Sequence, residues 1–251
     1  MNKPSFIIVG AQKAGTTALF RMLNQHSQLV GSRIKEVHYF DNDRKYKNKP
    51  IEFYHSFFED KSEDTIEKYF FEATPIYLYH PEVARRLYEY NQNLKIVVLV
   101  RDPIERMISA WVMYHYHFAT GPNSKYHESR TLNEIVRDCI KNQHESNFYN
   151  NRKGYLQRGL YIDQILNYLK HFNFRDIIFI NSQDLKGKHN KTMRRIFEFI
   201  GVEKEPLTRK ILNKASKKVD LVGTEEHEML MDFFYYPNKQ LYKLTDISFD
   251  D

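Results

Sequence analysis

Eight residues near the start of the chain have the spacing of a phosphate-binding loop. Gly10-Ala11-Gln12-Lys13-Ala14-Gly15-Thr16-Thr17 follows the apolar run Phe6–Val9 and precedes apolar residues at helical spacing. Two glycines separated by four residues, followed by a hydroxyl residue that opens a helix, aim backbone N–H groups and a helix N-terminus at an anion. The frame predicts a strand, a loop and a helix. The predicted anion contacts are Gln12, Lys13, Ala14, Gly15, Thr16 and Thr17.

The position of the lysine distinguishes this loop from the one that binds ATP. Nucleotide triphosphatases need a lysine directly after the second glycine, and this chain has Thr16 there. The lysine of this loop is Lys13, inside the loop. Its ammonium group is therefore expected close to the first phosphate and to whatever leaves that phosphate, rather than along the β- and γ-phosphates.

A second anion site is expected after a second buried strand. Lys95–Val100 is a continuous apolar run, typical of a parallel strand covered on both faces, and Arg101 follows it. Asp102 and Pro103 are a favourable N-cap and first residue of a helix, which carries Ser109 about two turns further on. Ligands of open α/β sheets gather outside the carboxyl ends of strands. If the two strands are neighbours, Arg101 and Ser109 can grip a second phosphate; taken alone, Arg101 would more simply pair with a nearby acid.

The rest of the chain continues to alternate strands and helices. The first helix is expected over Thr16–His26, and a later one ends at Gly201. A last helix is expected to start at Thr224, and Pro237 is expected to break it or to begin another. This order predicts an α/β fold in which one domain has a central parallel sheet flanked by helices.

That domain is expected to cover residues 1–251, with a polar, partly helical insertion on the surface over about 115–153. Tyr114, Tyr116, His117 and Tyr126 lie in or beside this insertion and are candidates to line a cleft for an acceptor.

Composition excludes several classes of protein. Of the 251 residues, 41% are hydrophobic and 28% are charged, which are globular values. A single cysteine, Cys139, excludes an internal disulfide and a cysteine-built zinc site. No run approaches the ~18 apolar residues of a membrane span, and no signal peptide precedes Phe6. We therefore expect a cytoplasmic protein, whose net charge of +6 suits an anionic ligand.

Several stretches together resemble the sulfotransferases that use 3′-phosphoadenosine 5′-phosphosulfate (PAPS). They are FIIVGAQKAGTTAL, KEVHYFD, FFEATPIYL, IVVLVRDPIERMISAW, RGLYIDQILNYLKHF, DIIFINSQDL and FFYYPNKQLYKL, which cover almost the whole chain in family order. The resemblance is strongest to the branch that contains heparan-sulfate sulfotransferases and their bacterial relatives. It implies PAPS as the donor, with a hydroxyl or amine of a carbohydrate, lipid or small natural product as the acceptor.

The resemblance also implies roles for individual residues. Lys13 to Thr17 would hold the 5′-phosphosulfate, with Lys13 neutralising the leaving oxygen, while Arg101 and Ser109 would hold the 3′-phosphate. Glu36 in KEVHYFD matches the general base of the heparan-sulfate branch. His38 is the second choice, because a histidine is the base in the cytosolic aryl and steroid branch. The basic residues Lys214 and Lys217 lie where the family places a late loop over the nucleotide.

Two departures from the family pattern concern the acceptor rather than the reaction. Heparan-sulfate 3-O enzymes have a functional lysine in Glu-Lys-Thr-Pro, where this chain has Glu72-Ala73-Thr74-Pro75. The C-terminal cysteine pair and the membrane anchor of those enzymes are not recognisable either. The acceptor, the choice between O- and N-sulfation, and the oligomeric state are left open by the sequence.

Two other functions compete with this interpretation. A P-loop kinase or nucleotidase would use ATP, but Thr16 stands in place of its lysine and no acidic cluster is placed like a magnesium site, so no metal is expected. A non-catalytic module could bind nucleic acid or another polyanion through the net charge of +6. No basic stripe with interleaved aromatics supports that module, so a nucleic-acid partner is not expected.

Overall fold

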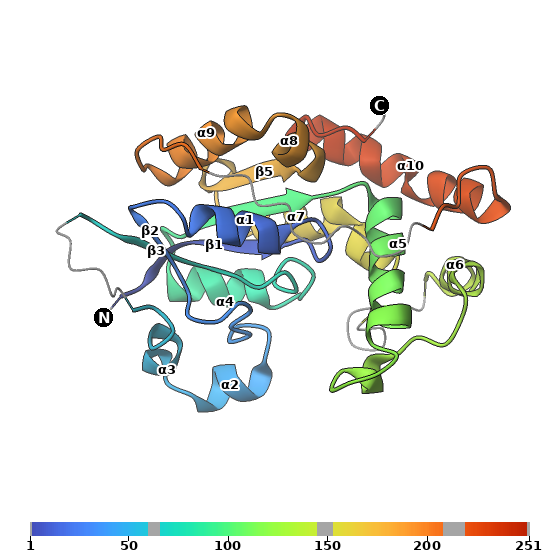
Figure 1. Ribbon diagram of the computed structural model, residues 1–251, viewed down its shortest axis with the longest axis horizontal. Coiled ribbons are helices and arrows are strands. Elements are labelled where there is room, and N and C mark those ends of the chain that lie inside the picture. The colour runs from blue at the N-terminus through green and yellow to red at the C-terminus, as the bar shows by residue number, and fades with distance from the viewer. Residues whose placement is uncertain (1, 60–65, 145–152, 208–218, 250–251) are drawn as a thin grey trace. The chain divides into compact units, whose positions relative to one another are not determined.

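The computed structural model describes residues 2–59, 66–144, 153–207 and 219–249 (Figure 1). The chain divides into two compact units. Unit 1 comprises residues 1–100 and 164–212, and unit 2 comprises residues 101–163 and 213–251.

Unit 1 is built on a five-stranded parallel sheet with the order β2-β3-β1-β4-β5 (Figure 1). The strands are β1 (Pro4–Gly10), β2 (Leu29–Gly31), β3 (Tyr69–Ala73), β4 (Lys95–Val100) and β5 (Ile177–Asn181). Residues 6–9 of β1 and 96–100 of β4 are fully buried, as expected for parallel strands covered on both faces. The predicted α/β fold with a central parallel sheet is confirmed, and β1 and β4 are neighbours.

Helices flank this sheet. They are α1 (Thr16–Leu23), α2 (Asp43–Asn48), α3 (Ile51–His55), α4 (Val83–Tyr90), α7 (Tyr161–Leu169, which begins in unit 2), the short η4 (Phe174–Asp176), α8 (Ser182–Gly187) and α9 (His189–Ile200). Helix α1 packs against β1, β2 and β3, and α8 and α9 pack against β5. Helix α1 ends three residues earlier than predicted, because residues 24–26 continue as single hydrogen-bonded turns. Gly201 closes α9 in the left-handed conformation, with a φ of 94°.

Unit 2 is helical. Its elements are α5 (Pro103–Val112), the π-helix η1 (Met113–His117), η2 (Ser124–Tyr126), α6 (Leu132–Lys141), η3 (Gln157–Gly159) and α10 (Glu225–Thr245). As predicted, Asp102 caps α5, accepting a hydrogen bond from the Glu105 N–H at 2.7 Å. Helix α6 lies in the segment predicted as a surface insertion, yet its Ile135 and Val136 are fully buried in the core of unit 2. Residues 145–152 of that segment lie outside the described residues.

The predicted break at Pro237 is wrong. Helix α10 runs through the proline without interruption, from a cap at Thr224 whose hydroxyl accepts the His227 N–H at 3.2 Å. Leu230 and Phe234 before the proline and Leu241 after it are all buried. Burial of this one face outweighs the single backbone hydrogen bond that a proline removes. Among the described helices, α10 included, none has both the length and the apolar content needed to cross a membrane.

Strand β1 ends where it meets the segment that follows β3. A Cβ atom on Gly10 would lie 2.5 Å from the Cβ of Leu78 and 3.2 Å from the carbonyl oxygen of Pro75. The same segment is tied to the strand, because the Leu78 N–H donates to the Val9 carbonyl at 2.7 Å. Only a residue without a side chain lets the strand end here and turn into the loop.

This close approach predicts the cost of a single methyl group. Gly10→Ala should lower the free energy of unfolding by about 2 kcal/mol, since the new Cβ meets the base of a side chain rather than its flexible end. Urea unfolding followed by circular dichroism measures the difference. Gly187→Ala is the control, because a Cβ there meets nothing within 4 Å. Equal urea midpoints for the Gly10→Ala variant and the wild type would show that the strand end can shift freely.

Candidate functional site

The loop after β1 is shaped by backbone conformations that favour an anion. Lys13 and Gly15 are both left-handed, with φ angles of 71° and 103°. Such a φ is uncommon for a lysine and costs free energy, and strain of this kind is concentrated at binding and catalytic sites. The Ala14 N–H closes the turn on the Ala11 carbonyl at 3.1 Å. The turn resembles the concave arrangements of N–H groups that bind phosphate.

The N-terminus of α1 opens directly from this loop. Its N-cap is Gly15, which supplies no side-chain cap, and its first turn carries no acidic side chain. The first N–H groups of a helix lack partners within the helix, and the helix dipole makes that end positive. Thr16 is buried and Thr17 is half-buried at this end. Lys13, the turn and the uncapped helix end therefore fit a phosphate group.

A second set of charged side chains follows β2. The His38 imidazole lies between two carboxylates: its Nδ1 is 2.9 Å from Asp41 Oδ2, and its Nε2 is 3.2 Å from Glu36 Oε2. Lys35 Nζ lies 3.0 Å from the other Glu36 oxygen. The structure thus brings Glu36 and His38 into contact. Asp41 was missed from the sequence, although its place three residues after His38 in KEVHYFD was a usable signal.

These contacts set the charges of the pair. The hydrogen bond to Asp41, with that to Glu36, raises the pKa of His38 to about 9 despite its partial burial. Burial by itself would raise the pKa of Glu36, but the hydrogen bond from His38 and the charge of Lys35 outweigh it and lower that pKa. At neutral pH the imidazole is protonated and Glu36 is ionised. Of the two, only Glu36 has lone pairs ready to accept a proton.

Arg101 and Ser109 belong to unit 2. Arg101 is the first residue after β4, and its Nε donates to Glu105 Oε2 at 2.8 Å. Its carbonyl accepts a hydrogen bond from the Tyr161 hydroxyl at 2.8 Å, which fixes the backbone at this point. Ser109 is half-buried on α5. Arg101 therefore has an acidic neighbour, which an anionic ligand would have to compete with or share.

Other predicted residues do not add to the described site. Lys214 and Lys217 lie outside the described residues. Tyr114, a candidate for the acceptor cleft, is buried in the core of unit 2 against Tyr155 and Phe118, so it has no exposed face to offer an acceptor. Tyr116, His117 and Tyr126 are exposed.

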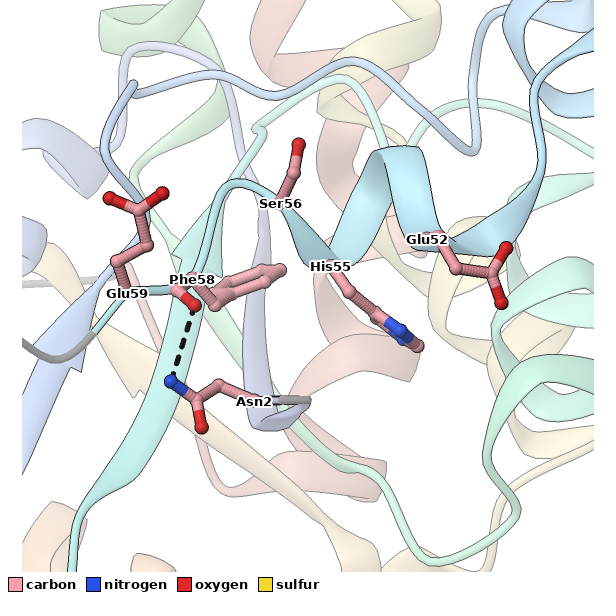
Figure 2. Close-up of a pocket in the computed structure, with 6 residues that line it drawn as sticks. All are labelled: Asn2, Glu52, His55, Ser56, Phe58 and Glu59. Carbon is pink, nitrogen blue, oxygen red and sulfur yellow. Dashed lines mark hydrogen bonds between the residues drawn. The ribbon is translucent and has the colours of Figure 1, made fainter.

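A pocket in unit 1 lies at the amino end of β1, whereas the loop of Lys13 follows its carboxyl end. It encloses about 320 Å³ and is lined by Asn2, Glu52, His55, Ser56, Phe58 and Glu59 (Figure 2). Asn2 precedes β1 and Lys13 follows it, so a seven-residue strand, roughly 20 Å long, separates them. Ligands of parallel α/β sheets bind at the carboxyl ends of the strands, which is where the loop of Lys13 begins. In the described part of the chain, His, Cys, Asp and Glu form no group of three or more that could hold a metal.

Residues 3–224 match the family model of the sulfotransferase domain. The chain belongs to the sulfotransferase family. This confirms the resemblance seen in the sequence motifs, and the match includes the loop, Glu36, His38, Arg101 and Ser109.

Similar proteins agree with this membership. The chain is 41% identical to human heparan sulfate glucosamine 3-O-sulfotransferase 5 over 156 residues, or 56% of this chain and 42% of that protein. It is 34% identical to the membrane-associated sulfotransferase kil1 of Dictyostelium discoideum over 148 residues, or 55% and 30%. The chain thus spans less than half the length of these curated relatives. The crystal structure of a sulfotransferase from Alicyclobacillus acidocaldarius has the same fold, with a TM-score of 0.75, 23% identity and coverage of 98% of this chain and 97% of that one.

The contacts of His38 predict how this family member titrates. The imidazole should lose its proton near pH 9, and Asp41→Asn should lower that pKa more than Glu36→Gln, because the hydrogen bond to Asp41 is the larger cause. NMR spectra of the ring nitrogens between about pH 5 and 10 measure both effects. His80 is an internal control, since burial lowers its pKa. A His38 midpoint close to 6.5 in the wild type would mean that the two carboxylates do not flank it in solution.

Proposed function

We propose that this chain transfers a sulfuryl group from PAPS to an acceptor hydroxyl or amine. The observation that carries the proposal is that unit 1 contains both a loop suited to phosphate, with Lys13, and an ionised carboxylate, Glu36. Both stand on segments joined to the carboxyl edge of the sheet. The family membership favours this reaction over ATP-dependent phosphoryl transfer.

The proposed chemistry is an in-line displacement. The acceptor oxygen or nitrogen forms a bond to sulfur while the bond between sulfur and the 5′-phosphate oxygen breaks. Glu36 takes the acceptor's proton, and its neighbour His38, protonated at neutral pH, orients that carboxylate rather than acting as the base. Lys13 and the N–H groups of the loop neutralise the charge that develops on the leaving phosphate. These residues supply a base and a cation without requiring a metal.

The nucleotide is proposed to have further contacts. Gln12, Ala14, Gly15, Thr16 and Thr17 would surround the 5′-phosphate. Arg101 and Ser109 would hold the 3′-phosphate, and Lys214 and Lys217 would lie over the bound nucleotide. We propose that both units act as one sulfotransferase domain, because the family match runs through both of them.

The acceptor is proposed to be a carbohydrate, a lipid or a small natural product. One relative is named for heparan sulfate glucosamine, which makes sulfated glycans the first acceptors to try. This chain has Ala73 where heparan-sulfate 3-O enzymes have a lysine, so neutral glycans, phenols, lipids and amines belong in the same panel. The cytoplasmic location stays a prediction. Transfer of labelled sulfate from PAPS to this panel is the direct test of the function.

Lys13→Ala should abolish most of the turnover and leave the nucleotide bound. Loss of a group that stabilises transition-state charge is expected to lower the rate by about 10²-fold or more. The affinity for adenosine 3′,5′-diphosphate, measured by calorimetry, should change much less, since Lys13 acts mainly in the transition state. Lys186→Ala, an exposed lysine of α8, is the matched control. Unchanged turnover in Lys13→Ala would refute the role of the loop.

Arg101→Ala should instead weaken binding of the nucleotide. Removing one charge-assisted contact to the 3′-phosphate is expected to raise the Kd for adenosine 3′,5′-diphosphate by about tenfold or more. The Kd for adenosine 5′-monophosphate, which lacks that phosphate, should stay the same. The control is Arg137→Ala, which removes ion pairs with Glu225 and Glu226 elsewhere in unit 2. Equal affinity of Arg101→Ala and the wild type for the diphosphate would place the 3′-phosphate site elsewhere.

A further inference from the structure

Glu72, near the end of β3, carries a carboxylate that is fully buried. Its Oε1 accepts a hydrogen bond from the Tyr54 hydroxyl at 2.7 Å, and its Oε2 accepts one from the Thr74 hydroxyl at 2.6 Å. The Tyr77 hydroxyl also interacts with this carboxylate and lowers its pKa. A buried carboxylate is costly unless such donors surround it. The proposed reaction gives Glu72 no part in binding or chemistry, so its presence calls for another explanation.

Two of these hydroxyls have a second set of partners. Thr74 Oγ1 accepts the Val37 N–H at 3.1 Å, and the Tyr77 hydroxyl accepts the N–H groups of Tyr39 at 3.1 Å and Phe40 at 3.3 Å. A hydroxyl has one proton to donate and lone pairs to accept with. Since the lone pairs face backbone N–H groups, each proton is left for the carboxylate. The hydrogen bonds therefore run in one direction, from N–H to hydroxyl to carboxylate.

We propose that Glu72 is a positioning residue for the proposed reaction: through Thr74 and Tyr77 it holds residues 37–40 and so places Glu36 and His38. This inference rests on the proposed function only where turnover is concerned. Glu36 directly precedes Val37, one of the held residues. His38 lies between two held residues and has a left-handed φ of 53°. That conformation is costly for a residue other than glycine and persists only where the surroundings enforce it.

The ionisation of Glu72 matters for this arrangement. Burial raises the pKa of Glu72 to about 7, against the three hydroxyls that lower it. Above that pH the carboxylate accepts from the hydroxyls on both oxygens. Below it the carboxyl group carries a proton of its own, so one of the hydroxyls that donate to it has to turn its proton away. Where that hydroxyl belongs to Thr74 or Tyr77, its hydrogen bonds with the backbone N–H groups are rearranged. The hold on residues 37–40 is therefore complete on the alkaline side of the transition and weakened on the acidic side.

Other ionisable groups near Glu72 do not produce the same transition. The phenols and the carboxyl group that interact with it electrostatically are Tyr54, Tyr77, Tyr90, Tyr168 and Asp41. Burial raises the pKa of each phenol, so all four stay protonated. The pKa of Glu36 is lowered and that of His38 is raised to about 9, so neither changes charge near pH 7. His55 contacts Tyr54 and Tyr90, and burial lowers its pKa below 6.5. The effect of Asp41 is distinguished from that of Glu72 by substitution.

The test is an NMR titration of backbone amides, which needs no acceptor. In the wild type the amide protons of Val37, Tyr39 and Phe40 should shift with a common midpoint near pH 7. Glu72→Gln keeps the size of the side chain but cannot titrate, so the transition should disappear. Asp41→Asn should keep the transition but lower its midpoint, because the charge of Asp41 raises the pKa of Glu72. The pKa of His38 also falls in this variant, so its ring nitrogens are followed in the same titration. Amides that do not shift between about pH 6 and 8, or that shift identically in Glu72→Gln, would overturn the proposal.

Tyr54→Phe provides a second variant in case Glu72→Gln does not fold. The Tyr54 hydroxyl donates to Glu72, and its loss removes one contact that lowers the pKa of Glu72. The midpoint of the three amides should rise, with the transition itself preserved. A purely structural role of Glu72 would not move that midpoint, so an unchanged midpoint in Tyr54→Phe would count against the proposal.

Kinetics with PAPS and an acceptor from the panel give the functional readout. Glu72→Gln should lower kcat by about tenfold or more, because a small misplacement of a catalytic group is costly. The Kd for adenosine 3′,5′-diphosphate should stay within about twofold, since the loop is untouched. A wild-type kcat in Glu72→Gln would refute the positioning role. A wild-type enzyme that transfers sulfate to no acceptor would refute the proposed function instead, and the amide titration would still decide the role of Glu72.

Discussion

Burying the carboxylate of Glu72 requires hydrogen-bond donors, and the residues that supply them shape the carboxyl edge of the sheet. Thr74 donates its hydroxyl proton to Glu72 and its backbone N–H to the Ile8 carbonyl of β1, at 3.2 Å. Four residues further on, Leu78 is tied to Val9 and leaves room only for a glycine at position 10. The segment after β3 therefore supports the end of β1, from which the phosphate loop starts, and the residues beside Glu36.

Unit 1 contains both a positively charged loop and an ionised carboxylate, Glu36. The loop offers an anion a lysine and an uncapped helix end, with no acid in the first turn. Glu36 stays ionised although it is partly buried, because the protonated His38 and Lys35 lower its pKa. Asp41 in turn keeps His38 protonated. The net charge of +6 therefore does not reveal that cations and carboxylates stand at separate places in unit 1.

The loop after β1 has the frame of a nucleotide-triphosphatase loop, but its lysine stands at another position. A lysine after the second glycine reaches the terminal phosphates of ATP. Here a threonine holds that place and the lysine lies inside the loop, in a left-handed conformation. The parallel sheet and the helix after the loop are unchanged in kind, and the fold is shared with the bacterial sulfotransferase. The difference lies in where one positive charge is placed.

Much of the fold and of the candidate site followed from the sequence, because the signals were local. Buried strands, the loop, the caps of α5 and α10 and the end of α9 were read from neighbouring residues. Family motifs pointed to Glu36, His38, Arg101 and Ser109. Local patterns failed where burial decided: α10 continues through Pro237, Tyr114 lies inside unit 2, and α6 contributes to that core.

Only the tertiary structure decided how Glu36, the proposed base, is held and charged. The contact between His38 and Asp41 spans three residues, and its spacing could have been noticed. The support from Glu72 reaches Val37 through Thr74, across 37 residues of sequence. No periodicity or spacing encodes such a contact, because it exists only once the parallel strands have brought their carboxyl ends together. The sequence by itself determined which groups this protein has for its chemistry, and the packing of the sheet edge determined their orientation and protonation.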